Sequence, residues 1–305
     1  MTSRSAHRSV QLPPPFGRCR LLGTARRTEQ FSLWPLAVGA GGRLALKVST
    51  RRARERLSWS ARLQRRVAGP CCMPVLLAWR HRQVTCWLEP WARATLAEVM
   101  DAERAGGQRP PPSVQLERLG RLLAAAQSCH GAGVCHRDIK PDNAFFLGAA
   151  GRSETLMLAD FGLAAAARAA PRDGAGTLAY QAPEVAAGEP FSPAADVFSL
   201  GATFVEMVVG MAPFEGDDEG HTLRLLAANR AQVGPREVSA VLEQSVAEAA
   251  DLARETATWT STLCATSRAN RPTAAQAAAE ARRLELRWRA LEGRARRRAG
   301  CPGGG

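Results

Sequence analysis

Residues 134–146 read VCHRDIKPDNAFF, and this stretch says more about the fold than any other part of the chain. It contains Lys140, one of only two lysines among 41 basic side chains; the other is Lys47. It also contains Ile139, the single isoleucine of the chain. Arginine is a planar fork, whereas lysine is a compact point charge on a flexible stem. Either lysine occurs at these two positions by chance, or the chemistry there requires lysine.

Side chains suited to phosphoryl transfer lie in and after this stretch. The reaction needs bound metal ions, a cation on the polyphosphate and a carboxylate near the incoming hydroxyl. Asp138, Asn143 and Asp160 offer a carboxylate and oxygen ligands for magnesium. The two lysines offer the cations. These residue types therefore favour phosphoryl-transfer chemistry.

Six motifs resemble those of eukaryotic-type protein kinases, and they occur in the family's order. They are LALKVS (44–49), HRDIKPDN (136–143), ADFG (159–162), GTLAYQAPE (176–184), ADVFSLG (195–201) and RANRPTA (268–274). The resemblance extends from about residue 20 to about residue 285. Six motifs in order are far more specific than one. The chain is thus similar to the serine/threonine protein kinases over nearly the whole domain.

The resemblance implies a role for the polar residues of these motifs. Asp138 would accept or orient the proton of the substrate hydroxyl, and Lys140 would steady the γ-phosphate. Asn143 and Asp160 would hold Mg²⁺, and Lys47 would contact the α- and β-phosphates of ATP. Both lysines would then approach phosphate oxygens in a crowded site, where a guanidinium is too large.

The resemblance also implies which residues bind the rest of the nucleotide. These cofactor-binding positions are Leu22, Gly23, Ala45, Glu89 and Trp91. ATP and Mg²⁺ are the expected cofactors. The expected partners are protein substrates with serine or threonine acceptors.

Other motif residues resemble structural elements of the family. Glu184 and Arg271 resemble the buried ion pair that ties the activation segment to the lower lobe. Asp196 resembles the helix residue that hydrogen-bonds the backbone of the catalytic loop. His136 and Phe161 are packing residues by the same analogy, so the histidine is not expected to act as a general base.

We expect an α+β, bilobal, protein kinase-like fold. Its parts would be a basic flexible tail (1–18), a small antiparallel β-sheet N-lobe with one main helix (19–89), a larger, mainly α C-lobe (90–290) and a disordered Arg/Gly tail (291–305). Three Ala- and Leu-rich segments have helical spacing, namely 194–211, 237–265 and 273–292.

The phosphate-binding loop departs from the family pattern G-x-G-x-x-G. With Gly23 as the first glycine, Ala25 and Thr28 occupy the second and third positions. A β-carbon restricts positive φ and keeps backbone amides further from the phosphates. We expect weaker ATP binding rather than its loss. VGAGG at 38–42 lies too close to Lys47 to be this loop and predicts a hairpin turn.

The helix glutamate that pairs with the third-strand lysine in the family has no clear counterpart. Its position falls near Ser60, and the only acid nearby is Glu55. Five residues along a helix correspond to about 7.5 Å of rise and about 140° of rotation, so Glu55 is expected to point elsewhere. Either the helix has a different register, or Lys47 pairs with Asp160 instead.

The activation segment also departs from many relatives. No Ser, Thr or Tyr lies between Gly162 and Gly176, so Arg137 has no phosphate to bind, although Asp173 offers a fixed carboxylate. We expect activity without phosphorylation of this segment. Thr177, which in the family bonds to the catalytic aspartate and the loop lysine, favours serine/threonine over tyrosine specificity.

Functions of different classes remain open. The set Lys47, Asp138, Lys140, Asn143 and Asp160 favours an active serine/threonine protein kinase. The eroded glycine loop and the missing helix glutamate motivate the alternative of a pseudokinase, a binding or scaffolding module with weak nucleotide binding. The segment GTLAYQAPE disfavours a small-molecule kinase.

The formal charge of +13 is concentrated in the first third of the chain. Residues 1–90 contain 17 Arg or Lys against three acids, whereas the remainder contains 24 against 25. Such a surface is either a solvated basic face or one that attracts an acidic partner or nucleic acid.

The sequence shows no apolar run of membrane-spanning length and no secretory signal. Its eight cysteines have no framework spacing and are interpreted as free thiols, with a metal site at CHGAGVCH (129–136) as a weak alternative. We expect an intracellular soluble protein of the cytoplasm or nucleus. The coding bias suits a large DNA virus, as in a herpesvirus-type kinase, or a high-GC bacterium.

Overall fold

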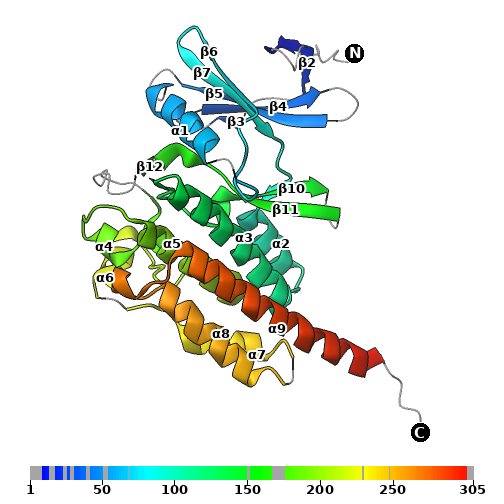
Figure 1. The fold of residues 1–305 in the computed structure, drawn as a ribbon, viewed down its shortest axis with the longest axis vertical. Coiled ribbons are helices and arrows are strands. Elements are labelled where there is room, and N and C mark those ends of the chain that lie inside the picture. The colour runs from blue at the N-terminus through cyan, green and yellow to red at the C-terminus, as the bar shows by residue number, and fades with distance from the viewer. Residues whose placement is uncertain are drawn as a thin grey trace.

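In the computed structural model, a sheet-based lobe stands above a larger helical lobe (Figure 1). The structure describes residues 9–13, 18–22, 26–27, 31–38, 42–50, 54–67, 69–149, 152–166, 176–228, 230–246 and 248–300.

The upper lobe is an antiparallel sheet in the order β1-β2-β4-β5-β7-β6, with β3 paired to β4. Its strands are β1 (Ser9–Gln11), β2 (Arg18–Leu21), β3 (Arg26–Arg27), β4 (Phe31–Val38), β5 (Gly42–Ser49), β6 (Leu77–His81) and β7 (Val84–Pro90). Val38 pairs with Gly42, so the hairpin predicted for VGAGG is confirmed. Leu36, Leu46 and Leu88 form much of the small core of this lobe.

The helix of the upper lobe, α1 (Arg54–Arg66), joins this lobe to the one below. Leu63 is buried in the large hydrophobic core that continues into the helical lobe, while Arg62, Arg65 and Arg66 are exposed. These three arginines therefore face solvent, and the apolar side of α1 connects the two lobes.

Among the described residues, the helical lobe has five strands, four short 3₁₀ turns and eight helices. Its strands are β8 (Ala94–Thr95), β9 (Val134–Cys135), β10 (Ala144–Ala149), β11 (Arg152–Leu158) and β12 (Ala165–Ala166). Its helices are α2 (Leu96–Ala105), α3 (Pro112–Gly131), α4 (Pro183–Ala186), α5 (Pro193–Val209), α6 (Glu219–Ala227), α7 (Pro235–Glu243), α8 (Ala250–Leu263) and α9 (Ala274–Gly300). Single 3₁₀ turns are η1 (Pro141–Asn143), η2 (Phe161–Leu163), η3 (Leu178–Tyr180) and η4 (Arg268–Asn270).

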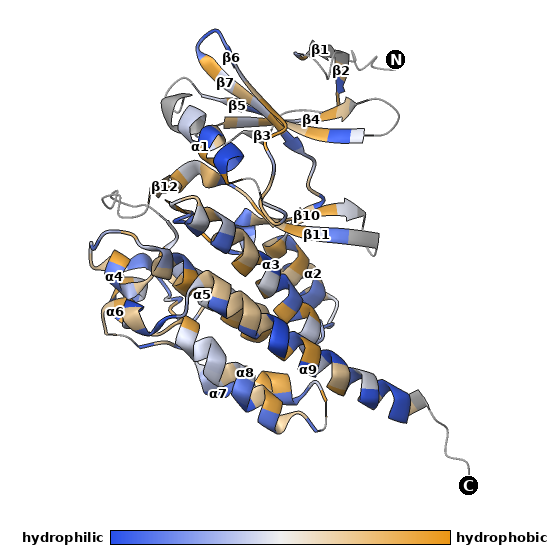
Figure 2. Ribbon diagram, in the orientation of Figure 1, coloured by the Kyte–Doolittle hydropathy of each residue, from blue (hydrophilic) through white to orange (hydrophobic). Residues whose placement is uncertain are grey.

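Helix α5 is the central support of this lobe. It is largely hydrophobic along its length (Figure 2), and Phe198, Leu200 and Phe204 are fully buried. A helix that is apolar on nearly every side must be surrounded by other elements. Two polar exceptions on α5, Asp196 and Thr203, are fully buried and therefore need partners inside the protein.

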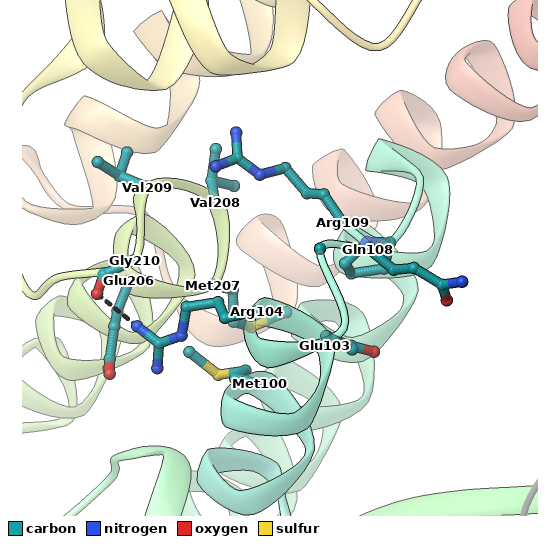
Figure 3. A pocket seen from close by; sticks show the side chains of 12 residues that line it. Met100, Glu103, Arg104, Gln108, Arg109, Glu206, Met207, Val208, Val209 and Gly210 are labelled. Atoms are coloured by element: carbon teal, nitrogen blue, oxygen red, sulfur yellow. Dashed lines mark hydrogen bonds between the residues drawn. The ribbon is translucent and has the colours of Figure 1, made fainter.

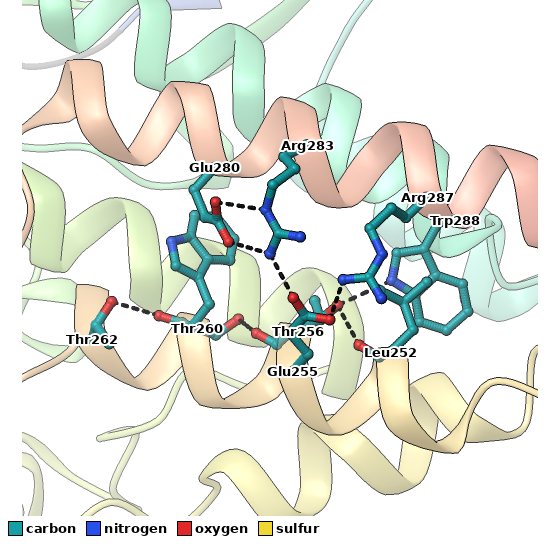
Figure 4. Close-up of polar contacts among 10 residues, drawn as sticks. Leu252, Glu255, Thr256, Thr260, Thr262, Glu280, Arg283, Arg287 and Trp288 are labelled. Atoms are coloured by element: carbon teal, nitrogen blue, oxygen red, sulfur yellow. Dashed lines mark hydrogen bonds and ion pairs between the residues drawn. The ribbon is translucent and has the colours of Figure 1, made fainter.

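Helix α9 runs beside α8 and is longer than the sequence predicts. Glu255 on α8 forms ion pairs with Arg283 and Arg287 on α9, and the buried Trp288 donates from Nε1 to Thr256 Oγ1 at 3.0 Å (Figure 4). These contacts fix the helix against the lobe.

The predicted disorder from residue 291 is wrong as far as Gly300, because the helix continues to that residue. Its Ala, Arg, Leu and Glu residues are good helix formers. Glu292 is also buried, and its carboxylate accepts hydrogen bonds from the backbone N–H and the hydroxyl of Ser113 at 3.0 and 2.6 Å. A carboxylate at the N-terminus of α3 is electrostatically favourable there.

Two other boundary predictions need correction. Part of the predicted flexible tail, Ser9–Gln11, forms β1 and pairs with β2. The segment 237–265 contains two helices, α7 and α8, because the chain turns at 244–246 and Ala249, just before α8, is fully buried. The predicted helical segment 194–211 corresponds to α5.

No helix within the described residues is both long enough and apolar enough to cross a lipid bilayer. The seven cysteines of the described residues are free thiols, as predicted.

Candidate active site

A cavity of about 820 Å³, including its open mouth, lies between the two lobes. The residues that line it from the upper lobe include Phe31, Leu33, Ala45, Lys47 and Glu89. Those from the connection and the lower lobe include Trp91, Thr95, Glu98, Phe145 and Asp160. Lys47 and Asp160, which are far apart in sequence, therefore face the same space.

Lys47 projects from β5 on the side of the sheet that faces this cavity. Its side chain is 11% exposed, and Nζ lies 2.8 Å from Glu89 Oε2. The ammonium also lies over the rings of Phe31 and Trp87, 5.3 and 5.9 Å from their centroids. A carboxylate and two aromatic faces thus surround the cation on three sides.

The electrostatic surroundings keep Lys47 charged. Burial by itself lowers the pKa of an ammonium group, but Glu89 and then Asp160 raise the pKa of Lys47, and the net result lies above its ordinary value. A permanent positive charge is therefore directed into the cavity.

The partner of Lys47 was not identified from the sequence. Its ion pair is with Glu89 on β7; Asp160 contributes only through its charge, and the helix supplies no carboxylate among the side chains that the structure describes. The side chain of Glu55 lies outside the described residues. The helix residue that reaches the pair is Gln64, one turn after the predicted Ser60, and its Nε2 donates to Glu89 Oε1 at 3.1 Å.

A sequence signal for Glu89 existed. Only three acids, Glu29, Glu55 and Glu89, occur in the first 90 residues. Few carboxylates in this part of the chain were therefore available to pair with a buried lysine.

The catalytic loop brings four of the motif residues into one hydrogen-bonded group. Asn143 Nδ2 donates to Asp138 Oδ2 at 2.8 Å and to Asp138 O at 2.7 Å. Lys140 Nζ donates to Thr177 Oγ1 at 2.6 Å, and Thr177 Oγ1 donates to Asp138 Oδ1 at 3.1 Å. The contacts predicted for Thr177 are confirmed, and Lys140 Nζ also lies 3.9 Å from Asp138 Oδ2.

Asp196 on α5 holds the loop from below. It is fully buried and accepts from the backbone N–H groups of His136 and Arg137, each at 2.9 Å. Arg137 has a left-handed φ of 73°, a conformation that needs support from its surroundings. The predicted role of Asp196 as the anchor of this backbone is confirmed.

His136 is a packing residue, as predicted. Its ring is fully buried and lies edge-on to Phe161, with centroids 4.8 Å apart, and Nε2 is 3.0 Å from Ala159 O. His130, in the segment that offered a metal-site alternative, places Nε2 2.9 Å from Asp196.

The segment after residue 175 is fastened to the loop and to the lower lobe. Gly176 has φ +92°, and a β-carbon there would lie 2.9 Å from Arg137 O, so this position requires glycine. Arg271 forms the predicted ion pair with Glu184, and the pair is bidentate, with N–O distances of 2.7 and 2.8 Å. The guanidinium of Arg137 lies over the ring of Phe191, 5.2 Å from its centroid. Asp173 lies outside the described residues.

Asn143 and Asp160 are adjacent because the two segments that carry them are hydrogen-bonded. Ala159 N donates to Asn143 O at 2.9 Å. The amide donors of Asn143 bind Asp138, which leaves its Oδ1 for another partner. Asp160 has a left-handed φ of 61°, and its Oδ1 accepts from Gly162 N at 3.2 Å.

This donor set fits magnesium. Mg²⁺ prefers oxygen ligands and is usually bound by one or two carboxylates together with substrate phosphates. Within the part of the chain that the structure describes, no cluster of three His, Cys, Asp or Glu side chains forms a metal cage. Asn143 and Asp160 would accordingly share a metal with bound phosphates.

The predicted nucleotide contacts are only partly gathered at the cavity. Ala45, Glu89 and Trp91 line it, whereas Leu22 is 38% exposed and does not belong to its described lining. Gly23, like Ala25 and Thr28, lies outside the described residues. The side chain of Glu89 turns to Lys47.

A second cavity lies deeper in the helical lobe, between the end of α2 and the end of α5 (Figure 3). Arg104 Nη1 there donates to Gly210 O at 2.7 Å, and Glu206 accepts from the hydroxyl of Tyr180 at 2.6 Å. The cavity contains none of the motif residues that suit phosphoryl transfer.

Comparison with known proteins agrees with this geometry. The family model described as the protein kinase domain matches residues 86–281, well over half of the chain. The match begins on β7 and includes the catalytic loop and α5.

Several bacterial serine/threonine-protein kinases are similar to part of the chain. PknA of Mycobacterium tuberculosis is 44% identical over 106 residues, which are 33% of this chain and 23% of that protein. PknJ of the same organism is 43% identical over 100 residues, 32% and 17% of the two chains. A kinase of Corynebacterium efficiens is 36% identical over 127 residues, 40% and 23% of the two chains. The matched part spans less than a quarter of each relative.

Proposed function

Because the chain belongs to the protein kinase domain family, we propose that it is an ATP-dependent serine/threonine protein kinase, which transfers the γ-phosphate of ATP to hydroxyl groups of protein substrates. The observation that carries the proposal is the placement of Lys47 and Asp160 at one cavity, with Asn143 and Asp138 bonded together beside Asp160. This combination supplies what phosphoryl transfer needs: a cation, metal-binding oxygens and a carboxylate for the acceptor.

Each motif residue has a separate task in the proposed reaction. Asp138 accepts or orients the proton of the acceptor hydroxyl and is held in place by Asn143 and Thr177. Lys140 steadies the transferring phosphate, and Lys47 binds the α- and β-phosphates. Asn143 and Asp160 hold Mg²⁺, which when bound neutralises phosphate charge.

The contact between Lys140 and Thr177 supports serine or threonine as the acceptor. Their 2.6 Å hydrogen bond puts the end of the activation segment directly against the catalytic loop. The segment 176–184, which the structure describes beside Asp138, suits a polypeptide substrate.

One of the two observations that favoured the pseudokinase alternative, the missing partner of Lys47, no longer supports it. Glu89 supplies the carboxylate that pairs with Lys47, which the family pattern assigns to a helix glutamate. The other observation, the eroded glycine loop, concerns Ala25 and Thr28, which lie outside the described residues.

The test is phosphate transfer from radiolabelled ATP with Mg²⁺ to a mixed set of serine- and threonine-containing peptides. Asp138→Asn is expected to lower kcat about 10²- to 10⁴-fold, the usual contribution of a positioned acid or base. The variant should keep the thermal stabilisation by Mg-ATP, because binding raises stability whether or not the reaction occurs.

Asp217→Asn is the matched control. This carboxylate is 96% exposed and contacts only His221 among the ion pairs described, so its variant should transfer phosphate normally. Full activity of Asp138→Asn would contradict the proposal.

We further expect the enzyme to be active as synthesised, without a phosphate on the activation segment. The packing of Arg137 against Phe191 supports this, because the guanidinium already has a partner. Intact-mass measurement of active enzyme checks it.

The free thiols support a reducing, intracellular compartment as the site of action. An acidic partner or nucleic acid at the basic first third stays a prediction, which salt-dependent pull-down would test.

A further inference from the structure

The carboxylate of Glu89 has an unusual number of partners for a residue predicted only as a nucleotide contact. It is 3% exposed and accepts three side-chain hydrogen bonds. The donors are Lys47 Nζ at 2.8 Å, Trp87 Nε1 at 2.9 Å and Gln64 Nε2 at 3.1 Å. Both oxygens are occupied, so the buried charge is fully compensated within the protein.

The sheet puts Glu89 and Lys47 on the same face. Ala45 pairs with Glu89 and Lys47 pairs with Trp87 across β5 and β7, and residues two apart on a strand share a face. The carboxylate and the ammonium therefore lie on a diagonal between adjacent, hydrogen-bonded strands. Their separation depends on the register of β5 and β7 in the sheet.

Helix α1 takes part through an amide and not through a charge. Gln64 is 3% exposed, and its Nε2 donates both to Glu89 and to Met73 O, the latter at 2.7 Å. A shift of α1 would remove one hydrogen bond from Glu89 but leave the ion pair of β5 and β7 in place.

We propose that Glu89 is the positioning residue of Lys47, holding its ammonium toward the phosphates from within the sheet, so that this arrangement does not depend on a carboxylate carried by α1. The inference rests on the proposed kinase function for its consequence, since a correctly held Lys47 matters for ATP. The ion pair itself can be tested without any catalytic assay.

The chain offers a direct probe, because it has only two lysines. Labelling with ε-¹³C lysine gives one NMR signal for Lys47 and one for Lys140, and a Lys140→Arg variant assigns them. The groups that face Lys47 are Glu89 on β7, Asp160 after β11 and the rings of Phe31 and Trp87.

The expected NMR result is a Lys47 pKa above the ordinary lysine value in the wild type and a lower one in Glu89→Gln. Burial then acts on the ammonium with only Asp160 opposing it. The matched control is Glu292→Gln, which changes a similarly buried glutamate whose described partner is Ser113. It should leave the Lys47 titration unchanged. An unchanged titration in Glu89→Gln would overturn the proposal.

The kinetic test exchanges the amide of Gln64 and the carboxylate of Glu89. Glu89→Gln should raise KM for ATP at least about tenfold, while KM for the peptide acceptor stays the same. The double variant Gln64→Glu with Glu89→Gln returns a carboxylate to this cluster from the helix side and should recover a substantial part of the loss. A merely structural role would affect both substrates and would not be rescued by the exchange.

Failure of the kinase proposal and failure of the proposed Lys47–Glu89 pairing give different results. A wild-type chain that transfers no phosphate, with a Lys47 pKa that still falls in Glu89→Gln, would contradict the kinase proposal and support the pairing. An active chain in which Glu89→Gln changes neither KM for ATP nor the Lys47 titration would overturn the pairing alone.

Discussion

Two buried carboxylates, one in each lobe, hold opposite ends of the candidate active site in different ways. Asp196 on α5 is fully buried, and two of its three donors are backbone N–H groups, those of His136 and Arg137; the third is the ring of His130. Backbone donors are fixed by the covalent chain and cannot be replaced by substitution. The catalytic loop is therefore bound to α5 by its main chain.

Glu89 on β7 accepts only from side chains. Each of these, Lys47, Gln64 and Trp87, comes from a different position of the sheet or helix and can change independently. Equal burial therefore does not mean equal constraint: the contacts of Asp196 tolerate little change, whereas those of Glu89 can be rebuilt from other side chains. The family model, which matches from residue 86, likewise begins at β7 and leaves most of the upper lobe outside its match.

The largest expected effect is that of Asp196→Asn. The amide keeps one acceptor oxygen but turns an NH₂ group toward N–H donors, which leaves buried groups unpaired. We expect a loss of about 3–5 kcal/mol in the free energy of unfolding, as when one partner of a buried charged cluster is removed. Urea denaturation measures it, with Asp217→Asn as the exposed control. A loss smaller than that of Glu89→Gln would contradict the inference that the contacts of Asp196 are the more constrained.

Glu89→Gln should cost less in stability, about 1–3 kcal/mol. Lys47 retains the charge of Asp160 nearby, and side-chain donors can turn to other acceptors. The same urea experiment gives this value beside that of Asp196→Asn. Equal losses in the two variants would show that the kind of donor does not matter.

A half-buried carboxylate of the helical lobe, Glu206, offers a further case, because the hydroxyl of Tyr180 donates to it at 2.6 Å. Burial raises the pKa of Glu206, the Tyr180 hydroxyl lowers it, Glu215 and Asp142 raise it and Arg104 lowers it, with a net increase. The folded-state value is therefore above the unfolded one. Stability from this group is present below the ordinary carboxyl pKa and is lost as pH rises through the folded value.

Tyr180→Phe removes the hydroxyl that stabilises the ionised form of Glu206. We expect a cost of about 1–2 kcal/mol near neutral pH and a smaller one below about pH 4, where the carboxyl group is protonated in both states. Urea unfolding at several pH values measures the difference. A cost that does not change with pH would contradict the assignment to Glu206.

The smallest effects should come from removing one side-chain hydrogen-bond donor from each of the two carboxylates, Asp196 and Glu89. His130→Leu and Gln64→Leu are each expected to cost about 1 kcal/mol, the usual net value of one hydrogen bond. Thermal unfolding of the pair checks this. If Gln64→Leu also raised KM for ATP as much as Glu89→Gln, the helix would matter more than the strand pair indicates.

Contacts that the motif resemblance implies were predictable. Asp196 bonds to the backbone of the catalytic loop, and Thr177 bonds to Asp138 and Lys140, as the motifs predict. Helical spacing in the sequence located α5 and most of α9. It did not place the break within 237–265 or the helical end of the chain, because Ala249 and Glu292 turn inward to contacts made by other elements.

By itself, the sequence determined the residue types of the site, their order and the elements that carry them, since these depend on covalent neighbours and on apolar spacing. Only the tertiary structure decided which carboxylate meets Lys47. That choice depends on strand register and on which acid is buried beside the ammonium, because an attraction of this strength arises only where water is excluded. Spacing along the chain contains no information about it.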